Sequence, residues 1–389
     1  MLTARSLGSR GAPALPYDRS TRPMTDDSQR SARAPDEFAQ AEDLFRRMPK
    51  AELHLHLDGS LRPSTALELA RERGLDGGMD LAAIAERLSA PEQVADQAEL
   101  LRAFDLPIAL MQDAESLTRI TRELVEDVAG DGTRYAEIRW GPALHVAGGM
   151  GLGESIHAVA SGAESGAAAT GAVVRLIAVA LRSHLPATNL AVAREATRFV
   201  GRGLVGFDLA GPEEAFPDPL LHREALDAAR DGGLAITIHA GEWGGAEQVR
   251  RALAVRPSRI AHGAPAIDDP LLVDDLAGRE ITLDLAPTSN VQASIFPSLS
   301  THPIARLHRA GVKVTLSTDD RTVSSLDLVR EYMNCYSVLG MSAAELWSVN
   351  MHALKFAFLD RDEAVRAALI ADFEDFAAHE PLLADRRVQ

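Results

Sequence analysis

Residues 50–59 read KAELHLHLDG, and the alternation within this stretch indicates the fold. Three leucines alternate with His54 and His56, which is the period of two expected of a β-strand. We predict a strand over Ala51–Leu57 that turns its leucines to one face and both imidazoles to the other. Because the chain has 12 histidines, a pair at this spacing is weak evidence by itself. Whether His54 and His56 belong to a functional site depends on which residues end the other strands.

Short apolar or β-branched runs recur along the chain and alternate with longer helical patterns, which is typical of βα units in a parallel sheet. The predicted strands are Ala51–Leu57, Thr133–Trp140, Val173–Ala180, Gly203–Asp208, Leu234–His239, Arg259–His262, Ile281–Leu285 and Val312–Thr318. Eight such units predict an α/β fold, a (β/α)8 TIM barrel. The long connection after the first strand contains helical patterns at Arg62–Arg73 and Glu115–Asp127, so we predict a helical insertion over the barrel mouth.

Polar side chains with acid, base or metal-binding chemistry end three further predicted strands. The fifth strand ends ITIHAGE with His239 and Glu242, the sixth ends RIAHG with His262, and the eighth ends TLSTDD with Asp319 and Asp320. The carboxyl ends of all strands in a barrel meet at one mouth, where catalytic groups gather. We therefore expect these side chains to share one site with the two histidines of the first strand.

Three imidazoles and a carboxylate suit zinc, which takes N and O ligands and keeps a position open for water in catalytic sites. We predict one zinc ion per subunit. Its predicted ligands are His54, His56, His239 and Asp319. Such an ion would lower the pKa of a bound water towards neutrality. His262 and Asp320 are then free to contact this water and the substrate, while Glu242, kept protonated, could donate a proton to an attacked heteroatom.

These motifs resemble those of the adenosine deaminase family. The strings MPKAELHLHLDGSL, GFDLAG, IHAGE, RIAHG, PTSN and STDD occur in the family's order, and the resemblance covers about residues 47–360. It implies hydrolytic deamination of adenosine, and of 2′-deoxyadenosine, to inosine and ammonia. It also implies roles for particular residues: Glu242 protonates purine N1, His262 orients the zinc hydroxide, Asp320 bonds to N7, the Gly211 backbone N–H bonds to N3, Asp58 binds the ribose 5′ hydroxyl, and His56 adjoins the substrate.

Asp58 also bears on the substrate, because relatives that act on free adenine resemble HIEG where this chain reads HLDG. A purine nucleoside is therefore favoured as the small-molecule partner. Two departures from the family pattern, Arg321 after the DD pair and Trp243 after the acid, leave open another 6-aminopurine nucleoside, such as an aminodeoxyfutalosine-like or N6-modified one. A different amidohydrolase-type metal hydrolase is the other alternative. Ser289 and Asn290 of PTSN are left outside the catalytic set.

Charge and composition narrow the class of partner. A formal net charge of −16 disfavours nucleic acid and anionic membranes, and no apolar run is long enough to span a bilayer. The one cysteine, Cys335, is consistent with a cytoplasmic setting and excludes a cysteine-rich deaminase site. We expect a disordered extension over residues 1–40, with Met24 as a possible start, the deaminase barrel over 44–365, and a C-terminal helix and tail over 366–389. The sequence leaves the oligomeric state open.

Overall fold

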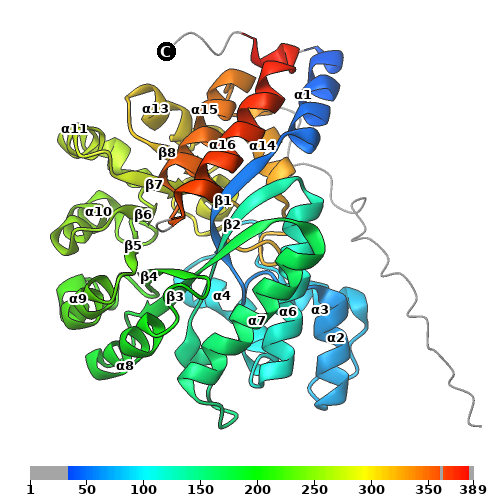
Figure 1. Cartoon of the computed structure of the whole chain (residues 1–389), viewed down its shortest axis with the longest axis vertical. Helices are drawn as coiled ribbons and strands as arrows, with labels where there is room; N and C mark the ends of the chain where they lie inside the picture. The colour runs from blue at the N-terminus through cyan, green and yellow to red at the C-terminus, as the bar shows by residue number, and fades with distance from the viewer. Residues whose placement is uncertain (1–33, 360–361, 385–389) are drawn as a thin grey trace, which may run out of the picture.

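The computed structural model of the chain describes residues 34–359 and 362–384. Its strands form one eight-stranded parallel sheet in chain order with helices around it (Figure 1), which confirms the predicted (β/α)8 barrel. The strands are β1 (Lys50–His56), β2 (Thr133–Trp140), β3 (Val173–Leu181), β4 (Leu204–Ala210), β5 (Ala235–Ala240), β6 (Arg259–His262), β7 (Thr282–Leu285) and β8 (Val314–Leu316).

Helices connect the strands and cover the outside of the barrel. The α-helices are α1 (Pro35–Arg47), α2 (Pro63–Glu72), α3 (Leu81–Leu88), α4 (Gln97–Leu101), α5 (Asp105–Leu110), α6 (Ala114–Gly130), α7 (Leu152–Thr170), α8 (Pro186–Thr197), α9 (Arg223–Asp231), α10 (Gly245–Ala252), α11 (Pro270–Gly278), α12 (Pro287–Gln292), α13 (Ile304–Arg309), α14 (Leu328–Ser337), α15 (Ala343–Phe356) and α16 (Glu363–Ala378). Single 3-10 turns are η2 (Arg102–Phe104), η3 (Pro142–Leu144), η4 (Pro219–His222), η5 (Leu253–Val255), η6 (Ala264–Asp268), η7 (Leu299–Thr301) and η8 (Pro381–Leu383).

The barrel closes between β8 and β1 at the predicted site residues. Asp319 pairs with Leu55 as an isolated parallel bridge. The His56 backbone N–H donates to the Asp319 carbonyl at 2.7 Å, and the Asp319 N–H donates to the His54 carbonyl at 3.1 Å. The predicted eighth strand, Val312–Thr318, is too long, because only its central residues form a regular ladder with β7. The last part of the predicted strand instead leads the chain to the closing contact with β1.

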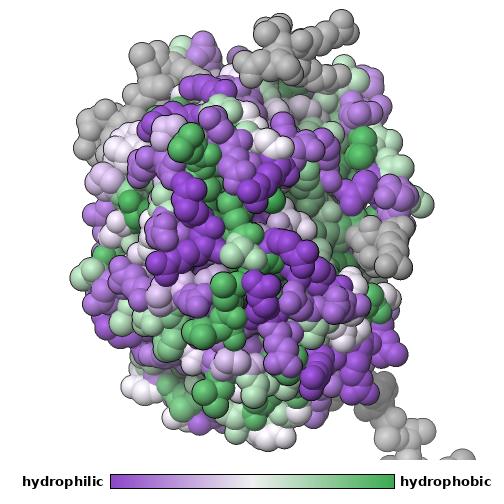
Figure 2. Space-filling view, turned by 90° about the vertical axis from the view of Figure 1, so that its left-hand side faces the viewer, coloured by the Kyte–Doolittle hydropathy of each residue, from purple (hydrophilic) through white to green (hydrophobic). Residues whose placement is uncertain are grey.

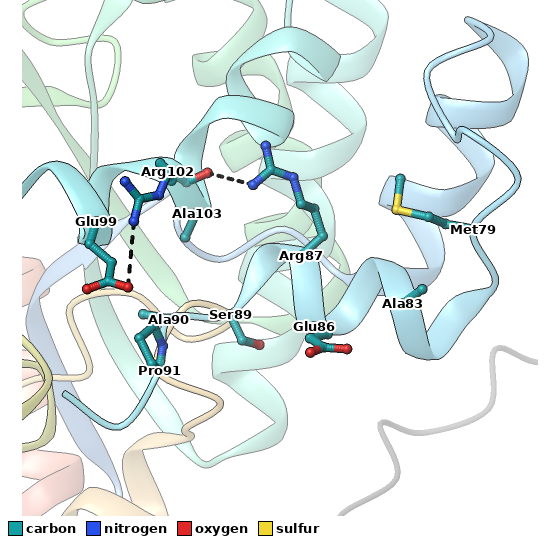
Figure 3. A pocket seen from close by; sticks show the side chains of 10 residues that line it. All are labelled: Met79, Ala83, Glu86, Arg87, Ser89, Ala90, Pro91, Glu99, Arg102 and Ala103. Atoms are coloured by element: carbon teal, nitrogen blue, oxygen red, sulfur yellow. Dashed lines mark hydrogen bonds and ion pairs between the residues drawn. The ribbon is translucent and has the colours of Figure 1, made fainter. Parts of the chain in front are cut away.

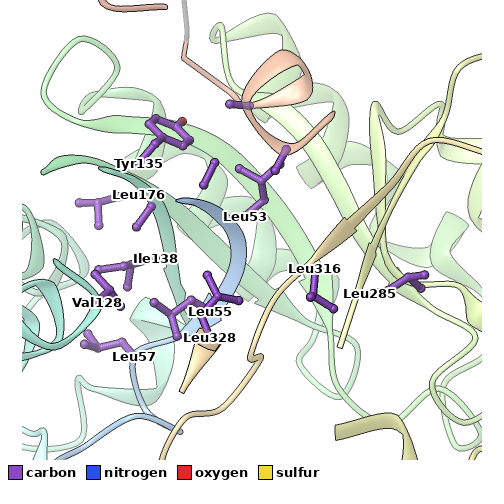
Figure 4. Close-up of a cluster of buried hydrophobic side chains, with 14 of the residues drawn as sticks. Leu53, Leu55, Leu57, Val128, Tyr135, Ile138, Leu176, Leu285, Leu316 and Leu328 are labelled. Atoms are coloured by element: carbon purple, nitrogen blue, oxygen red, sulfur yellow. The ribbon is translucent and has the colours of Figure 1, made fainter. Parts of the chain in front are cut away.

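The two faces of β1 have the different surroundings that its alternation predicts. Leu53, Leu55 and Leu57 are fully buried in the main apolar cluster, together with Val128 of α6 and Leu328 of α14 (Figure 4). The intervening histidines face the barrel interior, where they meet side chains of other strands. Burial of the leucines therefore fixes the direction in which the histidines point.

The helices α2 to α6 form the predicted insertion between β1 and β2, and the chain before α4 rests on loops at the carboxyl ends of the last strands. The Ala90 N–H donates to the Val323 carbonyl, and the Val94 N–H donates to the Gln292 carbonyl, both at 2.9 Å. Ala90 and Val94 also belong to a small apolar cluster with Val323. The insertion thus borders the barrel mouth.

Both predicted domain boundaries need moving. Helix α1 begins at Pro35, inside the predicted disordered extension of residues 1–40, because its apolar face packs on α14, with the rings of Phe45 and Tyr332 5.5 Å apart. Met24 lies outside the described residues. The predicted boundary between residues 365 and 366 cuts α16, which packs on the barrel's helices, since Phe373 is buried against Trp347 of α15.

The surface seen in Figure 2 mixes hydrophilic side chains with scattered apolar ones. Within residues 34–359 and 362–384, no helix combines the length and the apolar character that crossing a bilayer requires.

Candidate active site

Four ligand-type side chains converge at the carboxyl ends of β1, β5 and β8. The Nε2 atoms of His54 and His56 lie 3.2 Å apart, as do those of His56 and His239. Asp319 Oδ1 lies 2.9 Å from His54 Nε2 and 3.4 Å from His56 Nε2. The structure therefore brings together all four residues of the predicted ligand set.

Three of the four predicted ligands, His54, His239 and Asp319, have a polar group beside them on the side away from the other ligands. His239 Nδ1 lies 2.9 Å from Asp208 Oδ2, and His54 Nδ1 lies 3.4 Å from the Asp284 carbonyl, so a proton on each Nδ1 would leave the Nε2 lone pairs free for a metal. The Ser289 hydroxyl donates to Asp319 Oδ2 at 2.7 Å. Nitrogen and oxygen lone pairs that crowd together in this way repel one another unless a cation lies between them.

These donors fit zinc. Ligand atoms at ordinary zinc distances are separated by about 2.9 Å at right angles and about 3.4 Å at tetrahedral angles, and the four donors lie within this range where they adjoin. Burial lowers the pKa of His54 to about 3 and that of His56 well below its ordinary value, so both rings are neutral, as metal ligation requires.

Two site residues have strained backbones. His262 and Asp319 both have φ of 64°, a left-handed backbone conformation that residues other than glycine adopt rarely. Such a conformation costs about 1–3 kcal/mol of conformational free energy per residue. In both residues the strain falls where a strand ends and the chain turns across the mouth. Strain of this kind persists only where surrounding contacts impose it, and it is concentrated in functional sites.

Glu242 lies in a loop that a second glutamate holds. Glu213 accepts hydrogen bonds from the backbone N–H groups of Gly241 at 2.9 Å, Trp243 at 3.0 Å and Gly244 at 3.1 Å, on both sides of Glu242. Burial, with added repulsion from the Asp319 and Glu213 carboxylates, raises the pKa of Glu242 well above its usual range. The Glu242 side chain is therefore held in place as a neutral acid, able to donate a proton.

Two further carboxyl groups, Asp58 and Asp320, adjoin each other at the mouth. Burial raises the pKa of Asp58 to about 6. Burial also raises the pKa of Asp320 well above its usual range, and the nearby charges of Asp319 and Asp58 add to the effect. Gly59 makes room for this arrangement, because a Cβ at that position would overlap the Asp320 carboxyl group.

His262 is fully buried, and its ring is hydrogen-bonded only on the side away from the mouth among the described residues. On the mouth side, its Nε2 lies 3.9 Å from Glu242 Oε1 and 3.8 Å from Asp319 Oδ2. On the other side, its Nδ1 lies 2.9 Å from the Asn290 amide nitrogen, and the Asn290 amide oxygen lies 3.0 Å from His302 Nε2. The structure thus groups His262 with Glu242 and Asp319, as the sequence predicts, and adds a chain of polar residues behind it.

This arrangement has close relatives. The family model described as adenosine deaminase matches residues 49–373. An adenosine deaminase of Mycobacterium sp. (strain KMS) is 36% identical over 341 residues, which cover 83% of this chain and 93% of the relative. The chain belongs to the adenosine deaminase family. The resemblance inferred from the sequence motifs is confirmed.

Solved structures of similar proteins agree in fold. A zinc-bound amidohydrolase from Burkholderia ambifaria has a TM-score of 0.79 and 26% identity, covering 89% of this chain and 96% of that one. The N6-methyl-AMP deaminase of Arabidopsis thaliana has a TM-score of 0.75 and 30% identity, covering 86% of this chain and 98% of that one.

The two departures from the family pattern have different surroundings. The guanidinium of Arg321 pairs with Asp131 at 2.5 Å, at the end of α6 ahead of β2, so this side chain runs away from the mouth. Trp243 packs against the small apolar cluster that contains Ala90 and Val323. Of the two, Trp243 is therefore the residue that stays beside the predicted site, at the contact between the β5 loop and the insertion.

Gly211 follows β4 with φ of 102°, a conformation that favours glycine. The close approach of backbone to a ligand that the sequence suggested at Gly211 is compatible with this geometry. Arg182, which follows β3, lies next to Gly211. The Arg182 guanidinium donates to the His239 carbonyl at 2.9 Å, so Arg182 lies between the start of the β4 loop and a predicted metal ligand.

Sequence reasoning missed the residues behind the predicted ligands and acid. They are Asp208, Glu213, Ser289, Asn290 and His302. Asp208 lies within GFDLAG and the Ser-Asn pair within PTSN, so the motifs themselves were a usable signal. No motif marks His302.

A cleft of about 370 Å3 lies away from this site, among the helices of the insertion (Figure 3). Arg102 lies beside Glu99 there at 3.6 Å, and the Arg87 guanidinium donates to the Arg102 carbonyl at 3.4 Å. None of the predicted site residues lines this cleft, so it is not the mouth of the barrel.

Proposed function

We propose that this protein is a zinc-dependent hydrolytic deaminase that converts adenosine, and 2′-deoxyadenosine, to inosine and ammonia. The observation that carries the proposal is the convergence of three imidazoles and a carboxylate beside Glu242, a partly buried acid whose pKa is raised well above its usual range. The names of the curated relatives support adenosine as substrate. The proposed ligands are His54, His56, His239 and Asp319, and a bound ion would lower the pKa of a coordinated water.

The remaining side chains would act on the purine and on the attacking water. His262 would hold the water as its oxygen adds to C6, while the carboxylic acid of Glu242 gives its proton to N1. The amino group then leaves as ammonia, taking one proton from the water, and the other restores Glu242. Over the reaction, water replaces ammonia at C6, and the product carries a carbonyl at C6 and a proton at N1.

Polar groups at the mouth would recognise the rest of the nucleoside. The raised pKa of Asp320 keeps this carboxyl group protonated, so it would donate a hydrogen bond to N7. The Gly211 backbone N–H would bond to N3, Asp58 would bind the ribose 5′ hydroxyl, and His56 would adjoin the base. Asp58, whose pKa of about 6 leaves it mostly charged near neutral pH, would disfavour a 5′ phosphate, which is why we favour a nucleoside over a nucleotide.

A second candidate is deamination of another 6-aminopurine nucleoside with a modified amino group. Two observations support this second candidate: the likeness to an N6-methyl-AMP deaminase, and the position of Trp243 beside the mouth. In either case we propose a place in cytoplasmic purine salvage, which fits a chain whose single cysteine is a buried free thiol.

The test is hydrolytic turnover of adenosine, 2′-deoxyadenosine, adenine, AMP, N6-methyladenosine and an aminodeoxyfutalosine analogue by the purified zinc-loaded chain. Ammonia release is measured for the substrates with an unmodified amino group, and methylamine release for N6-methyladenosine. A sample treated with chelator, and the same sample with zinc restored, control for the metal. Adenosine turned over fastest, with loss under chelator and recovery with zinc, supports the proposal. Turnover of only N6-methyladenosine or the futalosine analogue would reassign the substrate, and turnover that survives metal removal would refute the zinc mechanism.

A further inference from the structure

We propose that Asn290 and His302 are positioning residues that keep the ring proton of His262 on Nε2. His262 then donates a hydrogen bond to the oxygen of the attacking water and does not remove its proton. The consequence for water rests on the proposed function, whereas the position of the ring proton follows from the hydrogen bonds alone.

The backbone N–H of Ile304 can only donate a hydrogen bond. It donates to His302 Nδ1 at 3.3 Å, so this nitrogen carries no proton. Burial lowers the pKa of His302 to about 3, which leaves the ring neutral. A neutral ring without a proton on Nδ1 must carry its proton on Nε2.

The proton on His302 Nε2 fixes the next residue. It is donated to the Asn290 amide oxygen at 3.0 Å, so the amide nitrogen of Asn290 faces His262 Nδ1 at 2.9 Å. An amide nitrogen only donates, so His262 Nδ1 accepts. The amide orientation, which is often ambiguous, is here determined by the backbone group at the far end.

On the mouth side, the proton of His262 therefore lies on Nε2. This nitrogen has no hydrogen-bond partner among the described residues. It lies 3.9 Å from Glu242 Oε1 and 3.8 Å from Asp319 Oδ2, so an oxygen bound between these groups could accept its hydrogen bond. Acting as a base would require the proton to lie on Nδ1, where it would meet the N–H of Asn290. The fully buried amide leaves no water to relieve that clash.

Two substitutions of His302 separate a hydrogen-bonding role from a packing role. In His302→Gln, the side-chain amide can still donate to Asn290, and we expect kcat and zinc content close to those of the unchanged chain. In His302→Leu the donor is lost, and we expect kcat to fall by about 10- to 100-fold, with KM and zinc content nearly unchanged. A glutamine variant as impaired as the leucine variant would overturn the proposal.

The tautomer itself can be read by 15N NMR of zinc-loaded protein labelled at histidine, with the His262 signals assigned by difference from His262→Gln. We expect a proton on Nε2 in the unchanged chain and in His302→Gln. In Asn290→Asp the carboxylate accepts from both rings, so we expect the His262 proton to move to Nδ1 and kcat to fall. A His262 proton already on Nδ1 in the unchanged chain would refute the inference.

A matched control exists between α8 and η4, where the Asn189 amide nitrogen lies 3.0 Å from His222 Nδ1. His222→Leu removes the same kind of buried bond away from His262. We expect lower thermal stability but an unchanged His262 tautomer and kcat within about twofold, since His222 bonds to Asn189 and to the Arg182 carbonyl and not to a predicted site residue. An equal loss of kcat in His222→Leu and His302→Leu would refute a specific role. If no substrate of the panel reacts, the proposed function fails, while the NMR result still decides the tautomer.

Discussion

Two clusters of charged and polar groups are buried in the barrel, and they differ in how completely their atoms are paired. The site cluster consists of His54, His56, His239 and Asp319. The closing cluster, centred where β6 begins, consists of Arg259, Glu137, Asp284 and Tyr135. In the closing cluster, Arg259 donates to both carboxylates and to the Phe356 carbonyl, and its guanidinium lies 3.6 Å from the centre of the Phe358 ring.

The comparison shows that buried polarity alone does not indicate function. Every side-chain nitrogen and oxygen of the closing cluster has a hydrogen-bond partner within the described chain. In the site cluster, lone pairs converge without a donor, and the nearby His262 Nε2 and Asp320 Oδ1 have no partner among the described residues. Unpaired polar atoms that gather at the barrel mouth, unlike the paired atoms of the closing cluster, are available to a metal, water and substrate.

The largest effect should come from removing a ligand of the site cluster. In His239→Ala one of the four donors is lost, and we expect the purified chain to retain little zinc and turnover to fall by about a thousandfold or more. Metal analysis by mass spectrometry and ammonia release measure both effects. A variant that keeps stoichiometric zinc and near-normal turnover would remove His239 from the ligand set.

Glu242→Gln tests the acid beside the cluster without touching a ligand. Glutamine keeps the size of the side chain but cannot give a proton to N1, so we expect kcat to fall by about 10²- to 10⁴-fold. Zinc content and thermal stability should stay close to those of the unchanged chain, as the same metal analysis and a melting curve would show. Near-normal kcat would assign proton donation to another group.

The fold and the reactive side chains were predictable from sequence because both depend on local patterns. The period of two in β1 placed its leucines and histidines on opposite faces, and short motifs marked the strand ends at His239, His262 and Asp319. In a barrel, the topology alone then brings those ends together. No details of the loops are needed for this step.

The supporting residues could not be predicted in this way. The contacts of Asn290 with His262 and His302 depend on the turn after β7 and on the path of the chain into α13, and neither has a periodic pattern. Asp208 was overlooked because GFDLAG was interpreted through its glycine, although the aspartate is on the strand itself. The register of β4 within the barrel is what turns Asp208 towards His239.

Asp208→Asn tests how far the site cluster depends on this carboxylate. Asp208 lies 2.9 Å from His239 Nδ1 and pairs with Arg139 at 2.8 Å, and asparagine would keep the shape but lose the charge. We expect zinc affinity to weaken by about 10- to 100-fold, as is usual when a residue behind a metal ligand is changed. Competition with a chelating dye measures this. Unchanged affinity would mean that Asp208 contributes to the barrel interior but not to the ligand.

Arg259→Met should leave chemistry almost unaffected and reduce stability. Removing the guanidinium leaves the carboxylates of Glu137 and Asp284 buried without their cation, which costs about 3–5 kcal/mol in comparable cases. Urea unfolding followed by circular dichroism measures the loss, while kcat and zinc content per folded molecule should stay within about twofold. Asp284 is the residue through which the two clusters could influence each other, because its carboxylate pairs with Arg259 and its carbonyl faces His54. If kcat or zinc content falls along with stability, the closing cluster acts on the site through β7, and the two clusters form one functional unit.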